Sequence, residues 1–288
     1  ALASSAKAIG ADEASTWLRT LPLKQMRDDG WISTEKDHST TLQSVLAFFN
    51  VSTPQEWEAR YTDFANSFAF RTSPSFESKA GALAAWLRRA ELRARAQQTR
   101  PWSEKNFRAA LVEIRRLTRS KSPEKFLPKL QAICATAGVA TVVLKSPAGC
   151  RASGASRFLS ADKAMMILSF RYLSDDHFWF TFFHEAAHLI LHQTRKPFVD
   201  TDDIESDPRE DEANSFAAGV LIPENRQEEM GNLPARADNI IRFAVSAGVS
   251  PGVVVGQLQH RKMLGLQQMN GLKRRYTWDQ ITETTITQ

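Results

Sequence analysis

The chain has 288 residues, of which 42% are hydrophobic, and this is enough for one large core or two of moderate size. Its formal net charge is +5, and its two cysteines, Cys134 and Cys150, exclude a disulfide framework and favour a reducing compartment. No apolar run approaches the roughly 20 residues that span a bilayer, so we expect a cytoplasmic protein without a membrane segment.

The first hundred residues predict a helical region, with helices expected at residues 17–26, 42–49, 54–69 and 79–98. Thr99, Arg100 and Pro101 then interrupt the helical pattern. We therefore expect two parts: a helical linker or regulatory region over residues 1–100 and a second domain over residues 101–288.

The second part mixes helices with short strands. Apolar, β-branched runs predict strands at residues 139–144 and 164–170, separated by turns. Helices are expected at residues 103–119, 123–138, 176–192, 208–221, 237–246 and 251–264. Helices before and after a small, mainly antiparallel sheet in the sequence predict an α+β domain.

Four of the six histidines fall within sixteen residues, from His177 to His192. Residues four apart on an α-helix differ by about 40° and one turn, so His184 and His188 project side by side. Glu185 follows His184 and completes an HExxH motif. In zinc hydrolases, two such imidazoles hold the metal and the carboxylate takes a proton from the attacking water. We predict His184 and His188 as metal ligands and Glu185 as the catalytic base.

The alternative is a helix whose histidines are exposed or hydrogen-bonded to the backbone. Against this, the neighbouring residues are apolar on almost every side, from Trp179 to Leu191, which predicts a buried helix. Buried imidazoles and carboxylates are costly unless a charged group compensates them. A divalent cation is such a group, so the pattern favours a metal site.

The third metal ligand is predicted to be a carboxylate. His192 does not fit the longer three-histidine motif, which requires a glycine after the second histidine and a different spacing. The helix expected at residues 208–221 offers Glu210 and Glu212. At about 100° per residue, Glu210 falls within the apolar stripe of that helix and Glu212 outside it, which favours Glu210. A capping box formed by Asp207, Pro208 and Glu210 is the alternative.

These motifs resemble a known family. The HExxH segment, followed by Glu210-x-x-Ala-Asn-x-Phe-Ala-Ala and Leu221-Ile-Pro223, is similar to the ImmA/IrrE metallopeptidases of bacterial and phage regulation. Residues 167–171, 174–183 and 251–259 resemble the branch in which this peptidase follows an N-terminal helix-turn-helix domain, as in antitoxin-like transcriptional regulators. The resemblance implies a gluzincin-like zinc peptidase coupled to transcriptional control, with Asn214 orienting a ligating imidazole. We expect the helix-turn-helix domain to be missing before Ala1.

Two basic runs, at residues 88–100 and 115–121, permit contact with nucleic acid. No base-reading motif accompanies them, so we interpret them as solvated helix faces that bind DNA weakly at most. Residues 237–258 have the outline of a helix-turn-helix, but Val253, Val254 and Val255 favour core packing over base recognition.

The leading functional hypothesis is a zinc-dependent endopeptidase that cleaves a regulatory protein, such as a transcriptional repressor or its own fused DNA-binding region, in a bacterial or phage stress or regulatory pathway. The strand at residues 164–170 is expected to receive the substrate as an added strand. The alternative is a zinc-stabilised sensor module that controls transcription without cleavage. Glu185 favours catalysis, because a purely structural metal site has no use for a base there.

Overall fold

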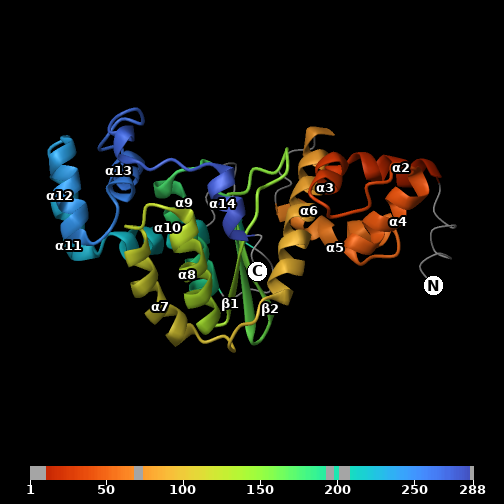
Figure 1. Ribbon diagram of the computed structural model, residues 1–288, viewed down its shortest axis with the longest axis horizontal. Coiled ribbons are helices and arrows are strands. Elements are labelled where there is room, and N and C mark those ends of the chain that lie inside the picture. The colour runs from red at the N-terminus through yellow and green to blue at the C-terminus, as the bar shows by residue number, and fades with distance from the viewer. Residues whose placement is uncertain (1–10, 68–73, 193–197, 201–207, 286–288) are drawn as a thin grey trace. The chain divides into compact units, whose positions relative to one another are not determined.

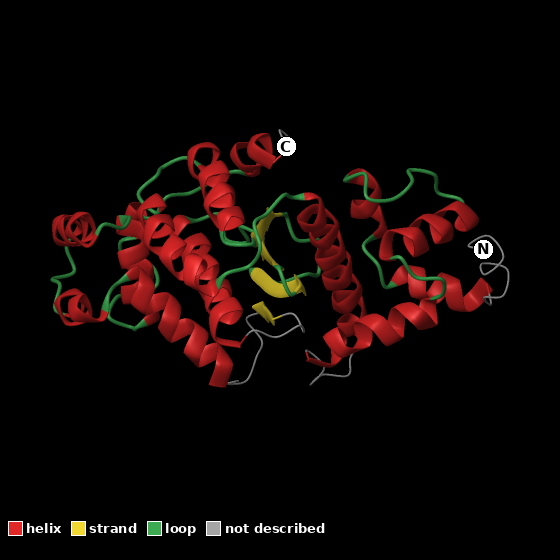
Figure 2. Cartoon of the chain, turned by 90° about the horizontal axis from the view of Figure 1, so that it is seen from below, coloured by secondary structure: helices red, strands yellow, loops and turns green. Residues whose placement is uncertain are grey.

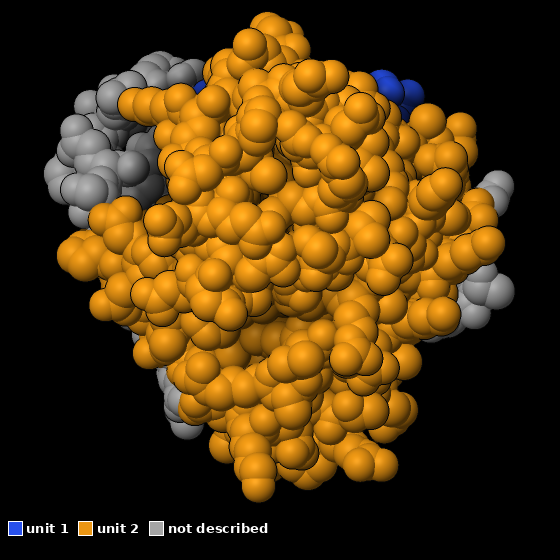
Figure 3. All heavy atoms as spheres, turned by 90° about the vertical axis from the view of Figure 1, so that its left-hand side faces the viewer, with its two compact units in different colours: residues 1–93, 146–152 blue, residues 94–145, 153–288 orange. Residues whose placement is uncertain are grey.

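The computed structural model describes residues 11–67, 74–192, 198–200 and 208–285 (Figure 1). The chain forms two compact units: unit 1 contains residues 1–93 and 146–152, and unit 2 contains residues 94–145 and 153–288 (Figure 3). The division lies inside a helix rather than at residue 100, where the sequence placed it. That helix ends at Ala96, before Pro101, and the division between the units falls within its last turn.

Unit 1 is helical. Its helices are α2 (Ala11–Arg19), α3 (Leu23–Asp28), α4 (His38–Phe49), α5 (Pro54–Ser67) and the greater part of α6 (Pro74–Ala96). The single helix expected at residues 17–26 is instead two helices, because Pro22 lacks an N–H group and restricts Leu21 before it. The rings of Trp17, Phe49 and Trp57 pack together, with centroids 5.8–6.5 Å apart.

Unit 2 carries the remaining helices. They are α7 (Glu104–Leu117), α8 (Pro123–Thr136), α9 (Asp175–Ala187), the π-helical turn η1 (His188–His192), α10 (Pro208–Leu221), α11 (Glu224–Gly231), α12 (Ala237–Ala247), α13 (Pro251–His260), the 3-10 turn η2 (Asn270–Leu272) and α14 (Trp278–Thr285). The sequence did not predict α11 or α14. Both are short, and α11 buries a single residue, Met230, so its apolar periodicity is weak.

The sheet of unit 2 has the strand order β1-β3-β2-β4, with β1 (Val139–Val143), β2 (Gly154–Ser160), β3 (Lys163–Leu168) and β4 (Phe198–Asp200). Figure 2 shows the strands in yellow among the helices. β1 pairs with β3 in parallel, and the other two pairings are antiparallel. The α+β class is confirmed. The expectation that residues 164–170 receive a substrate strand is wrong, because β3 lies between β1 and β2 and both of its edges are paired.

Helix α9 runs through the core of unit 2, beside α10 and α13 and against β2 and β3. Trp179, Phe182 and Phe183 are fully buried, together with most other residues of the helix. The buried helix predicted from its apolar surroundings is confirmed. The side chains of Cys134 and Cys150 are also buried.

The turn between α12 and α13 contains Gly248 in the left-handed region, with φ 74°. Val253, Val254 and Val255 are buried in the core, as the sequence predicted for this segment. None of the described helices is by itself long and apolar enough to cross a membrane, although α12 and α13, bent by 109°, satisfy length and composition as a pair.

Two arginines of the basic runs, Arg88 and Arg115, make structural contacts, so the interpretation as solvated faces does not hold for these two. Arg115 donates to the carbonyls of Leu221 and Ala247, at 3.0 and 2.6 Å. Arg88 lies 3.3 Å from Glu91 and donates to the carbonyl of Phe48. Their guanidinium groups therefore donate to backbone carbonyls at or near the ends of helices. Less positive charge faces solvent than the sequence suggests.

Two buried carboxylates fix the start of α9. Asp175 accepts hydrogen bonds from the Ser250 hydroxyl at 2.7 Å and from the backbone N–H of Arg274 at 2.9 Å. Asp176 lies 2.6 Å from the ammonium of Lys273. Burial alone would raise the pKa of Asp176, but hydrogen bonds from Lys273 and Ser174 leave this pKa below its ordinary value. The pair joins the C-terminal segment to α9.

We predict that Lys273→Met lowers the free energy of unfolding by about 3–5 kcal/mol, because it leaves Asp176 buried without its cation. Lys24→Met is the matched control, since the Lys24–Asp28 pair has a similar distance, 2.9 Å, but is exposed. Denaturant unfolding should show little change for the control. Equal losses of unfolding free energy in the two variants would contradict the conclusion that Lys273 compensates the buried charge of Asp176.

The sign of the pH dependence follows from the depressed pKa of Asp176. The stability that its carboxylate contributes is present above the unfolded-state pKa of about 3.9 and is lost as pH falls through the folded-state value. The difference in unfolding free energy between wild type and Asp176→Asn should therefore shrink on acidification below about pH 4. A difference that grows in this range would contradict the pairing.

Candidate metal centre

The two histidines of the HExxH motif meet at one point. His184 lies in the last turn of α9 and His188 begins η1, and both residues are 2% exposed. Their Nε2 atoms lie 3.0 Å apart. Two nitrogens directed at the same point within an apolar core are placed to share one cation.

Glu210 of α10 brings a carboxylate to the same point. Its Oε2 lies 3.0 Å from His184 Nε2, and its Oε1 lies 3.5 Å from His188 Nε2. Burial alone would raise the pKa of Glu210, but the two imidazoles lower it to about 2, so the group is an anion at neutral pH. The side chain of Glu210 is 17% exposed and that of Glu212 is 63% exposed, which confirms the helical phase predicted for α10. Asp207, the cap of the alternative capping box, lies outside the described residues.

Three ligand atoms, one each from His184, His188 and Glu210, all lie within 4.8 Å of one another. Two imidazole nitrogens and one carboxylate oxygen are a donor set that zinc accepts, with a fourth position left for water or substrate. The residues therefore fit a catalytic zinc ion. Asn214, one turn after Glu210, accepts from His184 Nδ1 at 3.0 Å, in the orienting role that the family resemblance implied.

Glu185 lies beside this cluster and is fully buried. Its backbone carbonyl accepts a hydrogen bond from the Ser156 hydroxyl of β2 at 3.2 Å. Its side chain packs against Gly154, where an added Cβ would lie 2.7 Å from Glu185 Cγ, Glu185 Oε1 and Thr181 Cγ2. The first residue of β2 must therefore be glycine for the sheet to approach the predicted base this closely.

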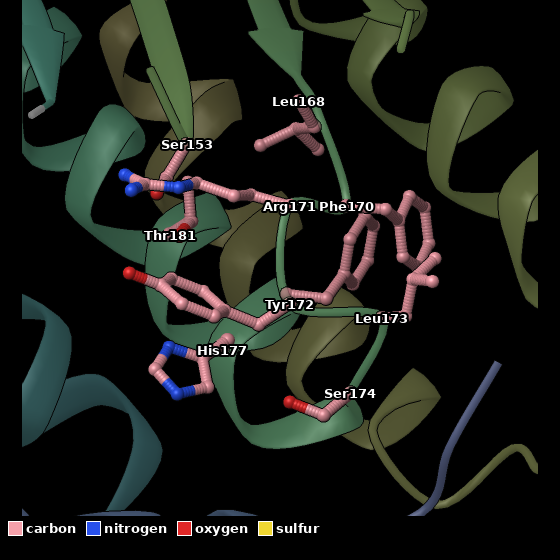
Figure 4. Close-up of a pocket in the computed structure, with 10 residues that line it drawn as sticks. Ser153, Leu168, Phe170, Arg171, Tyr172, Leu173, Ser174, His177 and Thr181 are labelled. Atoms are coloured by element: carbon pink, nitrogen blue, oxygen red, sulfur yellow. The ribbon is translucent and has the colours of Figure 1, made fainter. Parts of the chain in front are cut away.

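A pocket lies one helical turn before Glu185 on α9 and was not predicted. Figure 4 shows the Arg171 side chain running past Ser153 and Thr181, and the Tyr172 ring between Thr181 and His177. The pocket lining also includes Leu168, Phe170, Leu173, Ser174 and Phe178. Thr181 borders both the pocket and the Glu185 side chain, so the two features adjoin.

The pocket rim is held by an unusual turn. Phe170 and Leu173, on either side of Arg171 and Tyr172, both have φ of 50°. Such left-handed conformations are costly for bulky residues and cluster at functional sites. Hydrogen bonds from Leu173 N to Phe170 O at 2.9 Å and from Tyr276 N to Leu173 O at 2.8 Å hold the turn. The turn directs the Arg171 and Tyr172 side chains over the pocket.

Comparison with known families agrees with this geometry. Residues 139–259 match the family model described as the IrrE N-terminal-like domain, which is a peptidase family. The matched segment contains the sheet, α9, α10 and every residue of the metal cluster. A search of curated proteins found no match.

We predict that Glu210→Gln weakens zinc binding by more than the roughly 10- to 100-fold that loss of an outer partner costs, because it removes a ligand. Glu212→Gln should weaken it much less. Competition with a chromophoric chelator measures both affinities. If Glu212→Gln releases the metal and Glu210→Gln retains it, the third ligand is misassigned.

The approach of β2 to Glu185 is tested by Gly154→Ala, which should lower the free energy of unfolding by about 1–3 kcal/mol through overpacking. Gly219→Ala in α10 is the control, since an added Cβ there meets nothing within 4 Å. It should be neutral or stabilising in the same thermal or denaturant unfolding measurement. An unchanged free energy of unfolding in Gly154→Ala would show that an added Cβ fits beside Glu185 without overpacking.

Proposed function

Because residues 139–259 belong to the ImmA/IrrE family of peptidases, we propose that this protein is a gluzincin-like zinc endopeptidase that cleaves a regulatory protein in the bacterial cytoplasm. The observation that carries the proposal is the convergence of His184, His188 and Glu210 within 4.8 Å, beside a buried glutamate. A structural metal site would have four protein ligands and no base.

Each residue has a defined role in this proposal. His184, His188 and Glu210 would hold zinc, which supplies a Lewis acid for the peptide carbonyl and lowers the pKa of water when it is bound. Glu185 accepts the proton of the attacking water and passes it to the leaving amine. Burial of Glu185 keeps its carboxylate away from bulk water, which strengthens its interaction with charge in the site.

The rim of the pocket beside Thr181 is the proposed contact for a substrate chain next to the scissile bond, since the pocket itself has room for only about one water molecule. The pocket adjoins Glu185, and Arg171 and Tyr172 supply a cation and an aromatic ring at its rim. The proposed substrate is a transcriptional repressor or a DNA-binding region fused to this chain, as the resemblance to antitoxin-like regulators suggests. DNA contact through the basic helices themselves is expected to be weak and independent of sequence.

We predict that Glu185→Gln retains zinc and stability but lowers the cleavage rate by at least about 100-fold, because an amide cannot accept the proton. The measurement is cleavage of repressors encoded near this protein, with metal content determined on the same samples. Wild-type rates in Glu185→Gln would exclude the mechanism. Zinc binding without cleavage of any such protein would favour the sensor module.

His184→Ala should lose both zinc and stability, since it opens the ligand set and leaves His188 without its neighbour in an apolar setting. Metal analysis after dialysis and thermal unfolding report the two effects separately. Metal content equal to that of the wild type would contradict the ligand assignment.

A further inference from the structure

His192 and Glu212 form a second set of contacts behind the metal cluster. His192 Nδ1 lies 2.9 Å from His188 Nδ1, and His192 Nε2 lies 3.0 Å from Glu212 Oε2. The His192 side chain is 6% exposed, whereas that of Glu212 is 63% exposed. A chain of three polar groups therefore runs from the ligand His188 to the surface of α10.

The protons in this chain can be placed by elimination. A ligating His188 must present an unprotonated Nε2 to the metal, so its proton is on Nδ1. His192 Nδ1 must then accept, which puts the proton of neutral His192 on Nε2. That proton is donated to the Glu212 carboxylate. Each donor faces an acceptor in this arrangement, so the anion at the surface selects the tautomer of His188 that binds metal.

The local backbone suits this arrangement. In an α-helix, residues four apart are about 40° out of line. The chain instead forms a π-helical turn from His188 to His192, with i to i+5 hydrogen bonding, so the two residues are not oriented as in a regular α-helix. Single π turns inside α-helices are frequent at functional sites. Here the turn places the two Nδ1 atoms at hydrogen-bonding distance.

We propose that His192 and Glu212 are positioning residues that fix the His188 imidazole in its metal-binding tautomer and orientation. This inference rests on the proposed zinc site. His192 and Glu212 do not belong to the ligand cluster. In this proposal they act together through a chain of contacts, called the relay, that runs from Glu212 through His192 to the ligand His188. Asn214 serves the other ligand, His184, and is the second anchor on the same helix.

Zinc affinity of variants of the 288-residue chain, measured by chelator competition, tests the proposal. His192→Ala should weaken binding about 10-fold. Glu212→Gln should weaken it by a smaller factor, about threefold, because the exposed carboxylate is screened by solvent. Asp211→Asn is the control, since it removes the same charge from the neighbouring exposed position and should leave affinity unchanged. The double variant His192→Ala/Glu212→Gln should be no weaker than His192→Ala, because both act through one chain of contacts.

A second measurement separates positioning from a merely structural role. In the zinc-loaded, 15N-labelled wild type, NMR should show His188 protonated at Nδ1 and His192 protonated at Nε2. Glu212→Gln should shift the His192 signals, with thermal stability of the metal-free protein unchanged. Additive losses in the double variant, or equal effects of Asp211→Asn and Glu212→Gln, would overturn the relay. A wild type that binds no zinc would overturn the proposed function and the relay together, whereas zinc binding insensitive to His192 would overturn the relay alone.

Discussion

Burial of polar groups on one apolar helix is the constraint on which the arrangement of unit 2 depends. Helix α9 carries two carboxylates at its start and His184 and Glu185 near its end, and the turn η1 that continues it begins with His188; all five side chains are buried. Each such group costs several kcal/mol if it lacks a compensating partner. Partners come from different parts of the chain: Ser250 and Lys273 at the start, Glu210 and Asn214 at the end. The surrounding elements are therefore held to α9 by specific polar contacts as well as by apolar packing.

The part of the site that follows helical geometry could be predicted from the sequence. The side-by-side placement of His184 and His188 needs only their spacing of four residues. The choice of Glu210 over Glu212 needs only the apolar stripe of its own helix, and the exposures of 17% and 63% agree with it. Both inferences are local. They compare residues within a few turns of one element, where the period is fixed by backbone hydrogen bonding.

What the sequence could not predict depends on contacts between distant segments. The segment that forms β2 begins with Gly154, and its sequence therefore indicates a turn rather than a strand. The structural reason for the glycine is the close approach of the Glu185 side chain, which is distant in the sequence. Lys273 looks like a surface lysine until Asp176 is seen 2.6 Å from it. Arg115 belongs to a basic run, but its donors end on carbonyls of α10 and α12. In each case tertiary contacts override the local signal, and no periodicity within one segment encodes them.

The three contacts of α10 with the metal region fix the rotation of this helix. Glu210 and Asn214 are four residues apart and therefore lie on nearly the same face of α10. Glu210 belongs to the ligand cluster, and Asn214 contacts Nδ1 of His184. Glu212, about 160° around the helix from Glu210, reaches His192 from the surface. A rotation of α10 by one residue would turn Glu210 away from both imidazoles and leave them buried without an anion. The same helical phase that supplies the third ligand thus also supplies Asn214, the outer partner of His184, and Glu212, which contacts His192. A metal ion bound at the cluster would link α9, η1 and α10.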